Sequence, residues 1–344
     1  MPDYVEDGGS GVVAKNLATT VLVAEASSAG AIVEPDGITA DDVLSATPAG
    51  GRGRRRRGMF RRQFIAMLLL PSILLIGIFS YYPALRSLVG GFYQWNGFST
   101  PTYAGVSQFR EYVKSATFAP EARNLLLLVI GSILITLVSQ FIAAEVVCHL
   151  PKKVGTVAKY LLTLPIVLPP IVLIDVWAYL LNPTDGLINK VFGTVGLPQP
   201  EWLTNNHLAL VAILLVGFPW VSNLGFLIFL GGVQNLPREM TEASAVDGCG
   251  WFRRVFAMDI PMLMPQFRIV VVLSGVYAVQ NFITILLLTN GGPGNATMVP
   301  ALDMYQQAFQ NSNYGMGMAI GTLLFVAMLI FTLVVMRALR PRTA

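Results

Sequence analysis

Residues 124–149 read Asn124-Leu-Leu-Leu-Leu-Val-Ile-Gly-Ser-Ile-Leu-Ile-Thr-Leu-Val-Ser-Gln-Phe-Ile-Ala-Ala-Glu-Val-Val-Cys-His149, and Glu145 is the only acidic residue in the run. A helix needs about 20 mainly apolar residues to cross the hydrocarbon core of a bilayer. This stretch therefore predicts a membrane-spanning helix. Five further stretches are similarly apolar, at residues 64–88, 159–181, 208–233, 267–289 and 317–336. The sequence predicts an all-α membrane protein with six transmembrane helices.

The composition supports this prediction. Of the 344 residues, 54% are hydrophobic and 12% are charged, whereas a soluble domain carries roughly a quarter charged residues. The two cysteines, Cys148 and Cys249, exclude a disulfide framework and a cysteine-rich metal module. Two histidines, His149 and His207, do not support a histidine-rich site. We therefore predict no metal site.

The basic residues predict the orientation in the membrane. Cytoplasmic segments of membrane proteins carry an excess of Lys and Arg. If residue 62 is cytoplasmic, most of the 23 basic residues fall in cytoplasmic segments. We therefore expect a multi-pass protein of the cell (cytoplasmic) membrane with both termini cytoplasmic. The run that anchors the first helix contains Arg52, Arg54, Arg55, Arg56, Arg57, Arg61 and Arg62.

The same arginine run could by itself bind nucleic acid. Its position directly before an apolar stretch favours a membrane anchor instead, and we expect no nucleic-acid partner.

The first 51 residues differ from the rest of the chain. They contain eight acidic residues, with Lys15 as the only basic one. Such a segment buries too little apolar surface to offset its ordering entropy. We expect a disordered acidic tail that ends in the basic anchor (1–63), serving as a linker or as a regulatory or docking arm. The first transmembrane helix and its outer loop (64–123) follow, and then a core of five helices (124–340).

The segment between the fourth and fifth apolar stretches, residues 234–266, carries the most specific pattern. Pro237 is placed to start a short helix, and Asp247-Gly248 supplies a turn that ends it. A second helix follows, and Pro261 and Pro265 return the chain towards the membrane. This segment could be a plug for a partner's cleft, or an amphipathic loop that rests on the lipid headgroups. The second helix would have an apolar stripe of Trp251, Phe252, Val255 and Phe256, backed by Arg253 and Arg254.

This segment resembles the EAA loop of permeases from binding-protein-dependent ABC importers. The matching run is Glu242-Ala243-Ser244-x-x-Asp247-Gly248-Cys249, followed by Ile260-Pro261-x-x-x-Pro265. The family form is close to E-A-A-x-x-D-G-A and then L-P-x-x-x-P. Ser244 and Cys249 replace alanines, and Ile260 replaces leucine. Met258-Asp259 stands where Ile-Thr is common.

Two other loops extend the resemblance to carbohydrate-type permeases. Trp177-x-x-Leu-Leu-Asn-Pro183 followed by Asp185-Gly186-Leu-Ile-Asn189 resembles the outer loop after the third span. The run Thr289-Asn290-Gly291-Gly292-Pro293, with Tyr305-x-x-x-Phe309 and Tyr314-Gly315, is typical of the MalF/UgpA/LacF-like member of a permease pair. The resemblance covers residues 64–340.

The resemblance implies an ABC importer type-I permease fold and a transport function for a sugar or related polyol. It implies four partners: a second homologous (MalG-like) permease subunit, a cytoplasmic ABC ATPase dimer, an extracytoplasmic solute-binding protein and the lipid bilayer. The chain has no G-x-x-x-x-G-K-[ST] motif, so ATP would be used by the ATPase subunit. We expect no cofactor on this chain and no enzymatic activity of its own. The ATPase-docking residues would be Glu242, Ala243, Ser244, Asp247 and Gly248.

Glu242 and Asp247 could also have a local role, in capping and turn formation. One residue can serve both roles.

Polar residues in the apolar stretches are candidates for a substrate path. Ser274, Tyr277, Asn281 and Thr284 have a spacing that places them on one helical face, with Gln280 beside them. Hydroxyl and amide groups suit the hydroxyls of a sugar. The alternative is that they form hydrogen bonds between helices. Asn223 in the fourth stretch is a further candidate.

Two other classes of protein are less consistent with the sequence. A secondary transporter needs a coupling charge deep in the bilayer, and an intramembrane hydrolase needs a nucleophile with a base, or paired aspartates. Asp175 is the only acidic residue well inside a span away from the cytoplasmic edge. We expect Asp175 and Glu145 to be interfacial or paired with a neighbouring helix. The EAA loop favours the importer.

Overall fold

The computed structural model describes residue 64, residues 67–218 and residues 223–339. The predicted acidic tail and its basic anchor lie outside these residues. The chain divides after Leu75 into two compact units. In the first unit, the described residues are helical. The second unit is mainly helical, with one short antiparallel sheet that pairs Tyr93 with Tyr103.

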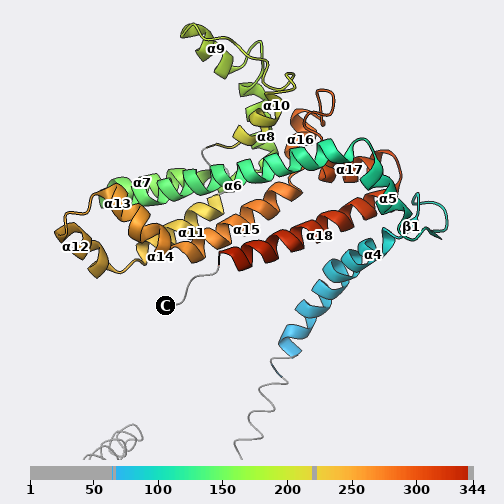
Figure 1. Ribbon diagram of the computed structural model, residues 1–344, viewed down its shortest axis with the longest axis horizontal. Coiled ribbons are helices and arrows are strands. Elements are labelled where there is room, and N and C mark those ends of the chain that lie inside the picture. The colour runs from blue at the N-terminus through green and yellow to red at the C-terminus, as the bar shows by residue number, and fades with distance from the viewer. Residues whose placement is uncertain (1–63, 65–66, 219–222, 340–344) are drawn as a thin grey trace, which may run out of the picture. The chain divides into compact units, whose positions relative to one another are not determined.

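The elements of the second unit follow one another as shown in Figure 1. They are η2 (Gly77–Tyr81), α4 (Tyr82–Gly90), β1 (Tyr93–Gln94), β2 (Thr102–Tyr103), α5 (Ser107–Lys114), α6 (Phe118–His149), α7 (Lys152–Thr163), η3 (Leu164–Val167), α8 (Pro170–Leu180), α9 (Leu187–Thr194), α10 (Ala209–Leu215), α11 (Asn223–Gln234), α12 (Arg238–Val246), α13 (Trp251–Arg254), η4 (Val255–Asp259), α14 (Ile260–Met262), α15 (Met264–Gln280), α16 (Ile283–Leu288), α17 (Pro300–Tyr305), η5 (Gln306–Gln310) and α18 (Tyr314–Ala338).

A bundle of long helices forms the centre of this unit. Helix α6 packs against α11 and α15, and α15 packs against α18 (Figure 1). The only proline of α6 is Pro120, in its first turn, where a proline costs no helical hydrogen bond. Its 32 residues make a helix about 48 Å long, so its ends extend beyond a hydrocarbon core of about 30 Å. Helices α12 and α13 lie at one end of the bundle, and α17 lies at the other.

The described residues contain three helices that are long and apolar enough to cross a membrane: Met67–Gly90, Phe118–His149 and Tyr314–Ala338. Counting each bent helix pair as one span raises the number to five. The expectation of a mostly helical membrane protein is confirmed, whereas the count of six remains a prediction. The predicted fourth span, 208–233, is seen as α10 and α11, and residues 219–222 between them lie outside the described part.

The predicted third span is not one straight helix. The Lys152–Val167 and Pro170–Leu180 segments meet at an angle of 99°. The reason is Pro169-Pro170, because a proline disfavours helical geometry in the residue before it and lacks a backbone donor. The predicted fifth span also breaks, at Asn281 between α15 and α16.

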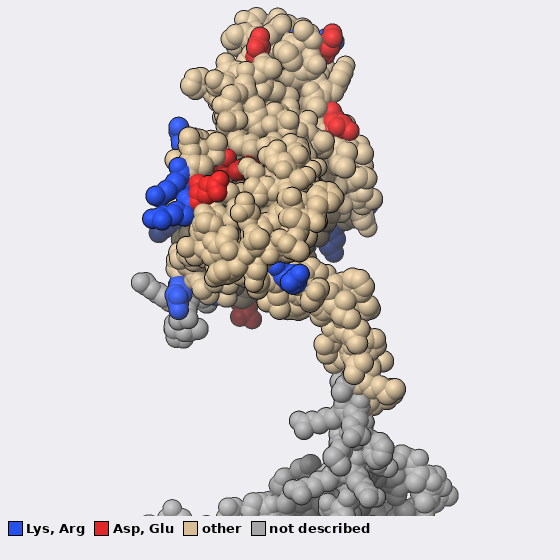
Figure 2. Space-filling model, turned by 90° about the vertical axis from the view of Figure 1, so that its right-hand side faces the viewer, with Lys and Arg blue, Asp and Glu red and all other residues tan. Residues whose placement is uncertain are grey.

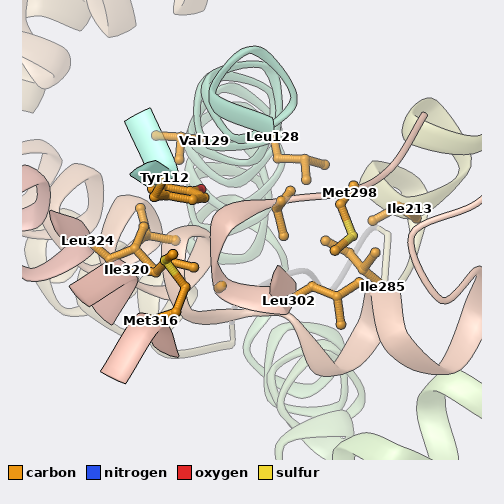
Figure 3. Close-up of a cluster of buried hydrophobic side chains, with 13 residues drawn as sticks. Tyr112, Leu128, Val129, Ile213, Ile285, Met298, Leu302, Met316, Ile320 and Leu324 are labelled. Carbon is orange, nitrogen blue, oxygen red and sulfur yellow. The ribbon is translucent and has the colours of Figure 1, made fainter. Parts of the chain in front are cut away.

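Two hydrophobic clusters hold the bundle together. The first joins α5, α6, α10, α16, α17 and α18, through residues such as Leu128, Leu302 and Ile320 (Figure 3). The second joins α6, α11 and α15 to the 234–266 loop. In it, the rings of Phe141, Phe229 and Phe267 pack with centroids 4.8–5.6 Å apart, and Val255 and Leu263 of the loop are buried beside them. The loop is therefore part of the core and not a free appendage.

The outer surface of the bundle is largely uncharged. The face in Figure 2 shows few charged side chains among many uncharged ones. Large apolar residues of α7, η3 and α8 are exposed, including Tyr160, Val167 and Ile171. Extended apolar surfaces mark membrane or protein contacts, which agrees with an integral membrane protein.

The segment around α9 is organised by one buried amide. Asn189 donates hydrogen bonds to the carbonyl oxygens of Pro183 and Pro200, both at 3.1 Å, and accepts one from Trp202 Nε1 at 2.9 Å. Gly186 is required just before the helix, because a Cβ there would lie 2.2 Å from the carbonyl oxygen of Asn182. The Asp-Gly-Leu-Ile-Asn motif thus has a structural role in this loop.

Candidate functional site

The 234–266 loop forms the short helix that its sequence predicts. Helix α12 begins directly after Pro237 and ends at Val246. Gly248 has a φ of +67°, and the backbone N–H of Cys249 donates to the carbonyl oxygen of Ser244 at 2.9 Å. This is a Schellman cap, which favours glycine because other residues rarely adopt the left-handed conformation. The predicted Asp247-Gly248 turn is therefore confirmed.

Most of the predicted docking residues are on the surface. Ser244 is buried, whereas Glu242, Ala243, Asp247 and Gly248 are exposed. The carboxylates of Glu242 and Asp247 make no hydrogen bond or ion pair with any residue that the structure describes. Both carboxylates are therefore available to a partner, and the described contacts do not support a capping role.

The predicted apolar stripe on the second loop helix is divided between the core and the surface. Val255 is buried in the core, but Phe252 is 72% exposed and Phe256 is 69% exposed. The helix changes from α13 to the π-helical η4 at Val255. The wider π-helical turn shifts the following side chains off the face that regular α-helical spacing predicts.

Arg253 and Arg254, predicted together on the polar side, diverge in the structure. Arg253 is exposed, whereas the Arg254 side chain turns inwards and is only 15% exposed.

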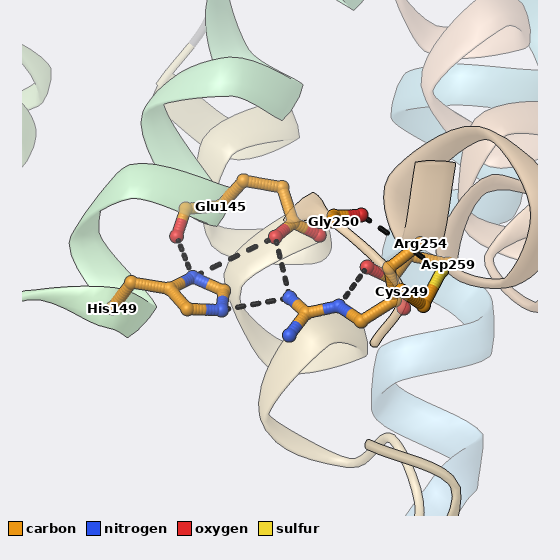
Figure 4. Close-up of polar contacts among 6 residues, drawn as sticks. All are labelled: Glu145, His149, Cys249, Gly250, Arg254 and Asp259. Atoms are coloured by element: carbon orange, nitrogen blue, oxygen red, sulfur yellow. Dashed lines mark hydrogen bonds and ion pairs between the residues drawn. The ribbon is translucent and has the colours of Figure 1, made fainter. Parts of the chain in front are cut away.

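Arg254 joins the loop to the end of α6 (Figure 4). Its Nε donates to Asp259 Oδ2 at 3.1 Å, and its Nη2 lies 2.7 Å from His149 Nε2 and 3.9 Å from Glu145 Oε2. Glu145 is 1% exposed and Asp259 is 4% exposed. The expectation that Glu145 pairs with a neighbouring segment is confirmed.

The contact between Arg254 and Asp259 was not predicted from the sequence. The signal in the sequence was Asp259 itself, because an acid stands where the EAA-loop pattern commonly has threonine. In the structure this acid is buried.

A pocket of about 520 Å³ lies between the end of α6, the start of α7 and the loop. Its lining includes Glu242 of the predicted docking motif, together with Arg254 and Asp259 of the contact just described. Lys152 and Lys159 contribute positive charge from α7. Glu242 of the predicted docking motif therefore borders a recess that has both charged and apolar lining residues.

The candidates for a substrate path do not share one face. Ser274 is buried and donates to the carbonyl oxygen of Val270 at 2.7 Å. Thr284 is buried and donates to Asn281 Oδ1 at 2.9 Å. Tyr277 is 54% exposed, and Gln280 is also exposed. Because α15 ends at Gln280 and Asn281 leaves helical geometry, helical spacing does not place Asn281 and Thr284 on the face of Ser274 and Tyr277, and the four residues do not form the predicted single face.

Asn223 is the first residue of α11, and its side chain lies outside the described part.

Buried acidic groups also occur at the α17 end of the bundle. Burial raises the pKa of the Asp303 carboxyl, although the hydrogen bond from Gln307 Nε2 at 3.2 Å opposes that shift. Burial and the hydrogen bond to Glu121 at 2.7 Å raise the pKa of the Tyr112 hydroxyl. These groups form internal contacts of the fold. Within the described residues, no group of three or more His, Cys, Asp or Glu side chains is placed to bind a metal ion.

Comparison with known proteins identifies relatives over most of the chain. A family model described as "Binding-protein-dependent transport system inner membrane component" matches residues 136–344. The diacetylchitobiose uptake system permease protein NgcF of Streptomyces coelicolor is 28% identical over 302 residues, covering 83% of this chain and 85% of that protein. The sn-glycerol-3-phosphate transport system permease protein UgpA of Agrobacterium fabrum is 26% identical over 270 residues, covering 77% of this chain and 91% of that protein.

A solved structure has the same fold. A chain from the crystal structure of a bacterial alginate ABC transporter, in complex with an alginate pentasaccharide-bound periplasmic protein, superposes with a TM-score of 0.72 at 18% identity. The match covers 83% of the present chain and 96% of that chain.

Proposed function

This chain belongs to the family of binding-protein-dependent transport system inner membrane components, and on that premise we propose that it moves a sugar or related polyol across the cytoplasmic membrane. The family consists of membrane permease subunits of ABC importers, so the chain is not an enzyme. The resemblance predicted from the loop motifs is confirmed. Transport would follow alternating access between two arrangements of the helices.

The observation that carries the proposal is the exposed helix α12 with its glycine cap. Ala243 and the unpaired carboxylates of Glu242 and Asp247 are exposed, and Glu242 lines the recess beside the helix. Small residues allow a close approach of another protein, and the carboxylates can pair with basic groups that become desolvated on contact. We assign this surface to a cytoplasmic ABC ATPase dimer. ATP is used by that subunit, and the present chain binds no cofactor.

The remaining partners follow from the family. A second homologous permease subunit encloses the path together with this chain, and an extracytoplasmic solute-binding protein delivers the substrate. The solved relative is named as a complex with a periplasmic protein that carries an alginate pentasaccharide, which supports this arrangement. We assign the exposed apolar surface to the lipid bilayer and to the second permease subunit.

The proposed topology has six transmembrane helices with both termini cytoplasmic. Residues 1–63 form the tail and anchor, residues 64–123 the first helix and outer loop, and residues 124–340 the permease core with its coupling loop at 234–266. The loop and the end of α6 then lie on the cytoplasmic side.

Within the path, Tyr277, Gln280 and Asn281 are the candidates that contact substrate. The buried Ser274 and Thr284 support them. Asn223 is a further candidate.

Affinity co-purification from native membranes with a tag at Ala344 tests the proposal. We expect wild-type protein to recover a P-loop ATPase and a second homologous permease chain. Gly248→Pro should lose the ATPase, because proline fixes φ near −65° and Gly248 has a φ of +67°. Gly250→Pro is the matched control, because Gly250 already has a φ of −64°.

Recovery of wild-type protein without any ATPase would contradict the proposal. An ion-coupled secondary transporter would then be the alternative.

A further inference from the structure

We infer that Arg254 is a positioning residue that couples the docking loop to α6 through Glu145, His149 and Asp259. This inference rests on the proposed function, because it assigns a mechanical role to the loop that docks the ATPase.

Arg254 is held from two sides. Its own helical segment provides Asp259, which accepts from Nε at 3.1 Å. Helix α6 provides His149 Nε2 at 2.7 Å and Glu145 Oε2 at 3.9 Å from Nη2. The guanidinium group therefore connects the loop to a helix that is 105 residues away in sequence. The hydrogen bond to Asp259 holds the guanidinium group in position next to α6.

The contact with Arg254 determines which ring nitrogen of His149 carries the proton. A guanidinium group carries only donors, so His149 Nε2 must accept the hydrogen bond from Arg254. The proton of the neutral imidazole then lies on Nδ1, which is 2.7 Å from the backbone carbonyl oxygen of Glu145 and donates to it. The last turn of α6 thus presents an acceptor to Arg254 in a fixed orientation.

Within this contact, the Glu145 carboxylate is the group whose hydrogen bonding can change. Its carboxylate is buried, and neither oxygen has a hydrogen-bond partner among the described residues. A buried carboxylate without hydrogen bonds is costly, and at 3.9 Å the Arg254 contact is an ion pair without a hydrogen bond. A movement of the loop towards α6 would shorten this distance and form the missing bond. We thus assign to the loop and α6 a second arrangement, which differs from the observed one by this hydrogen bond.

Apolar packing keeps the loop attached independently of this contact. Val255 and Leu263 are buried in the cluster that contains Phe229 and Phe267. Removing a charge from Glu145 or Arg254 should therefore leave the loop in place and change only how its movement is transmitted. This separation makes the role of Arg254 testable.

The test uses the complete assembly, with both permease subunits, the ATPase and the binding protein, reconstituted in lipid nanodiscs. The variants are Glu145→Gln, Arg254→Gln and Arg254→Lys, and the matched control is Arg253→Gln. Arg253 is the exposed neighbour of Arg254 and forms no ion pair with the described residues. The readouts are the ATPase content of the assembly, its basal ATP hydrolysis, and the stimulation of hydrolysis by the liganded binding protein.

We expect Glu145→Gln and Arg254→Gln to keep the ATPase and basal hydrolysis. Their stimulation by the binding protein should fall about tenfold or more, the effect of losing one hydrogen bond to a charged group. Arg254→Lys should restore part of the stimulation because it keeps the charge, and Arg253→Gln should match wild type. A purely structural role would lower ATPase content and stimulation together.

The remaining outcomes overturn the inference, and the readouts distinguish them from one another. Normal stimulation in both Gln variants, with the ATPase present, overturns the coupling role and leaves the proposed function intact. Failure of both variants to give a monodisperse assembly on size-exclusion chromatography assigns the contact to folding alone. A wild-type assembly without ATPase overturns the proposed function and this inference together. If only Arg254→Gln fails to assemble, Glu145→Gln decides, because it preserves side-chain volume.

Discussion

The glycine cap of α12 allows a quantitative prediction. At Gly248 the φ of +67° is left-handed, and a Cβ added there would meet no atom within 4 Å. The cost of Gly248→Ala is therefore purely conformational, about 1–2 kcal/mol. If only the capped loop docks the ATPase, the apparent affinity for the ATPase should fall by about 5- to 30-fold, since about 1.4 kcal/mol corresponds to tenfold. Gly248→Asn should lose less, because asparagine tolerates this conformation better.

The assay is a titration of purified ATPase subunit onto the permease pair in nanodiscs, with the apparent Kd as the readout. Gly250→Ala is the control, because Gly250 has a φ of −64° and equally open surroundings. We expect its affinity to equal that of wild type. Wild-type affinity in Gly248→Ala would refute the reasoning, and so would an equal loss in Gly250→Ala. A weaker complex for asparagine than for alanine would show that side-chain contacts, and not backbone geometry, control docking at this position.

Three further predictions concern other parts of the chain. Asn189→Ala removes three hydrogen bonds and should destabilise the α9 segment by about 2–4 kcal/mol, measured as faster amide hydrogen exchange over residues 183–202; unchanged exchange would contradict the role of this amide. Tyr277→Ala should slow substrate uptake while ATPase recovery stays at the wild-type level, and normal uptake by membrane vesicles would remove this exposed side chain from the path. For Asp303, burial raises the folded-state pKa, so ionisation costs more in the folded protein and stability falls as pH rises from the unfolded to the folded pKa. Asp303→Asn should therefore raise the Tm above that range and lose its advantage at lower pH, whereas a pH-independent difference in Tm would refute this reasoning.

Local signals made the helix α12 predictable. Pro237 and Gly248 act on the backbone within one or two residues of themselves, so the start and end of α12 follow from the sequence alone. The long helices α6 and α18 were predictable for a similar reason, because an uninterrupted apolar run with no central proline has few alternatives in a membrane.

Long-range contacts and interrupted helices limited the other predictions. The 99° bend before α8 arises at a Pro-Pro pair that was visible in sequence, but sequence does not specify the direction or size of a bend. The break at Asn281 ends α15, so Asn281 and Thr284 no longer follow the helical spacing of Ser274 and Tyr277. A helical projection assumes continuous α-helical geometry, and it fails where that geometry ends.

The sequence by itself determined the class of this protein, an integral membrane permease, and it also determined the short helix α12 with its glycine cap. These features depend on hydrophobicity and on local backbone preferences, which act between near neighbours in the chain. Only the tertiary structure decided which of the two adjacent arginines faces the protein, and that Asp259 and Glu145 are buried on either side of Arg254. The physical reason is that α6 supplies His149 and Glu145 from more than 100 residues away in the sequence, so no local pattern shows which arginine they meet.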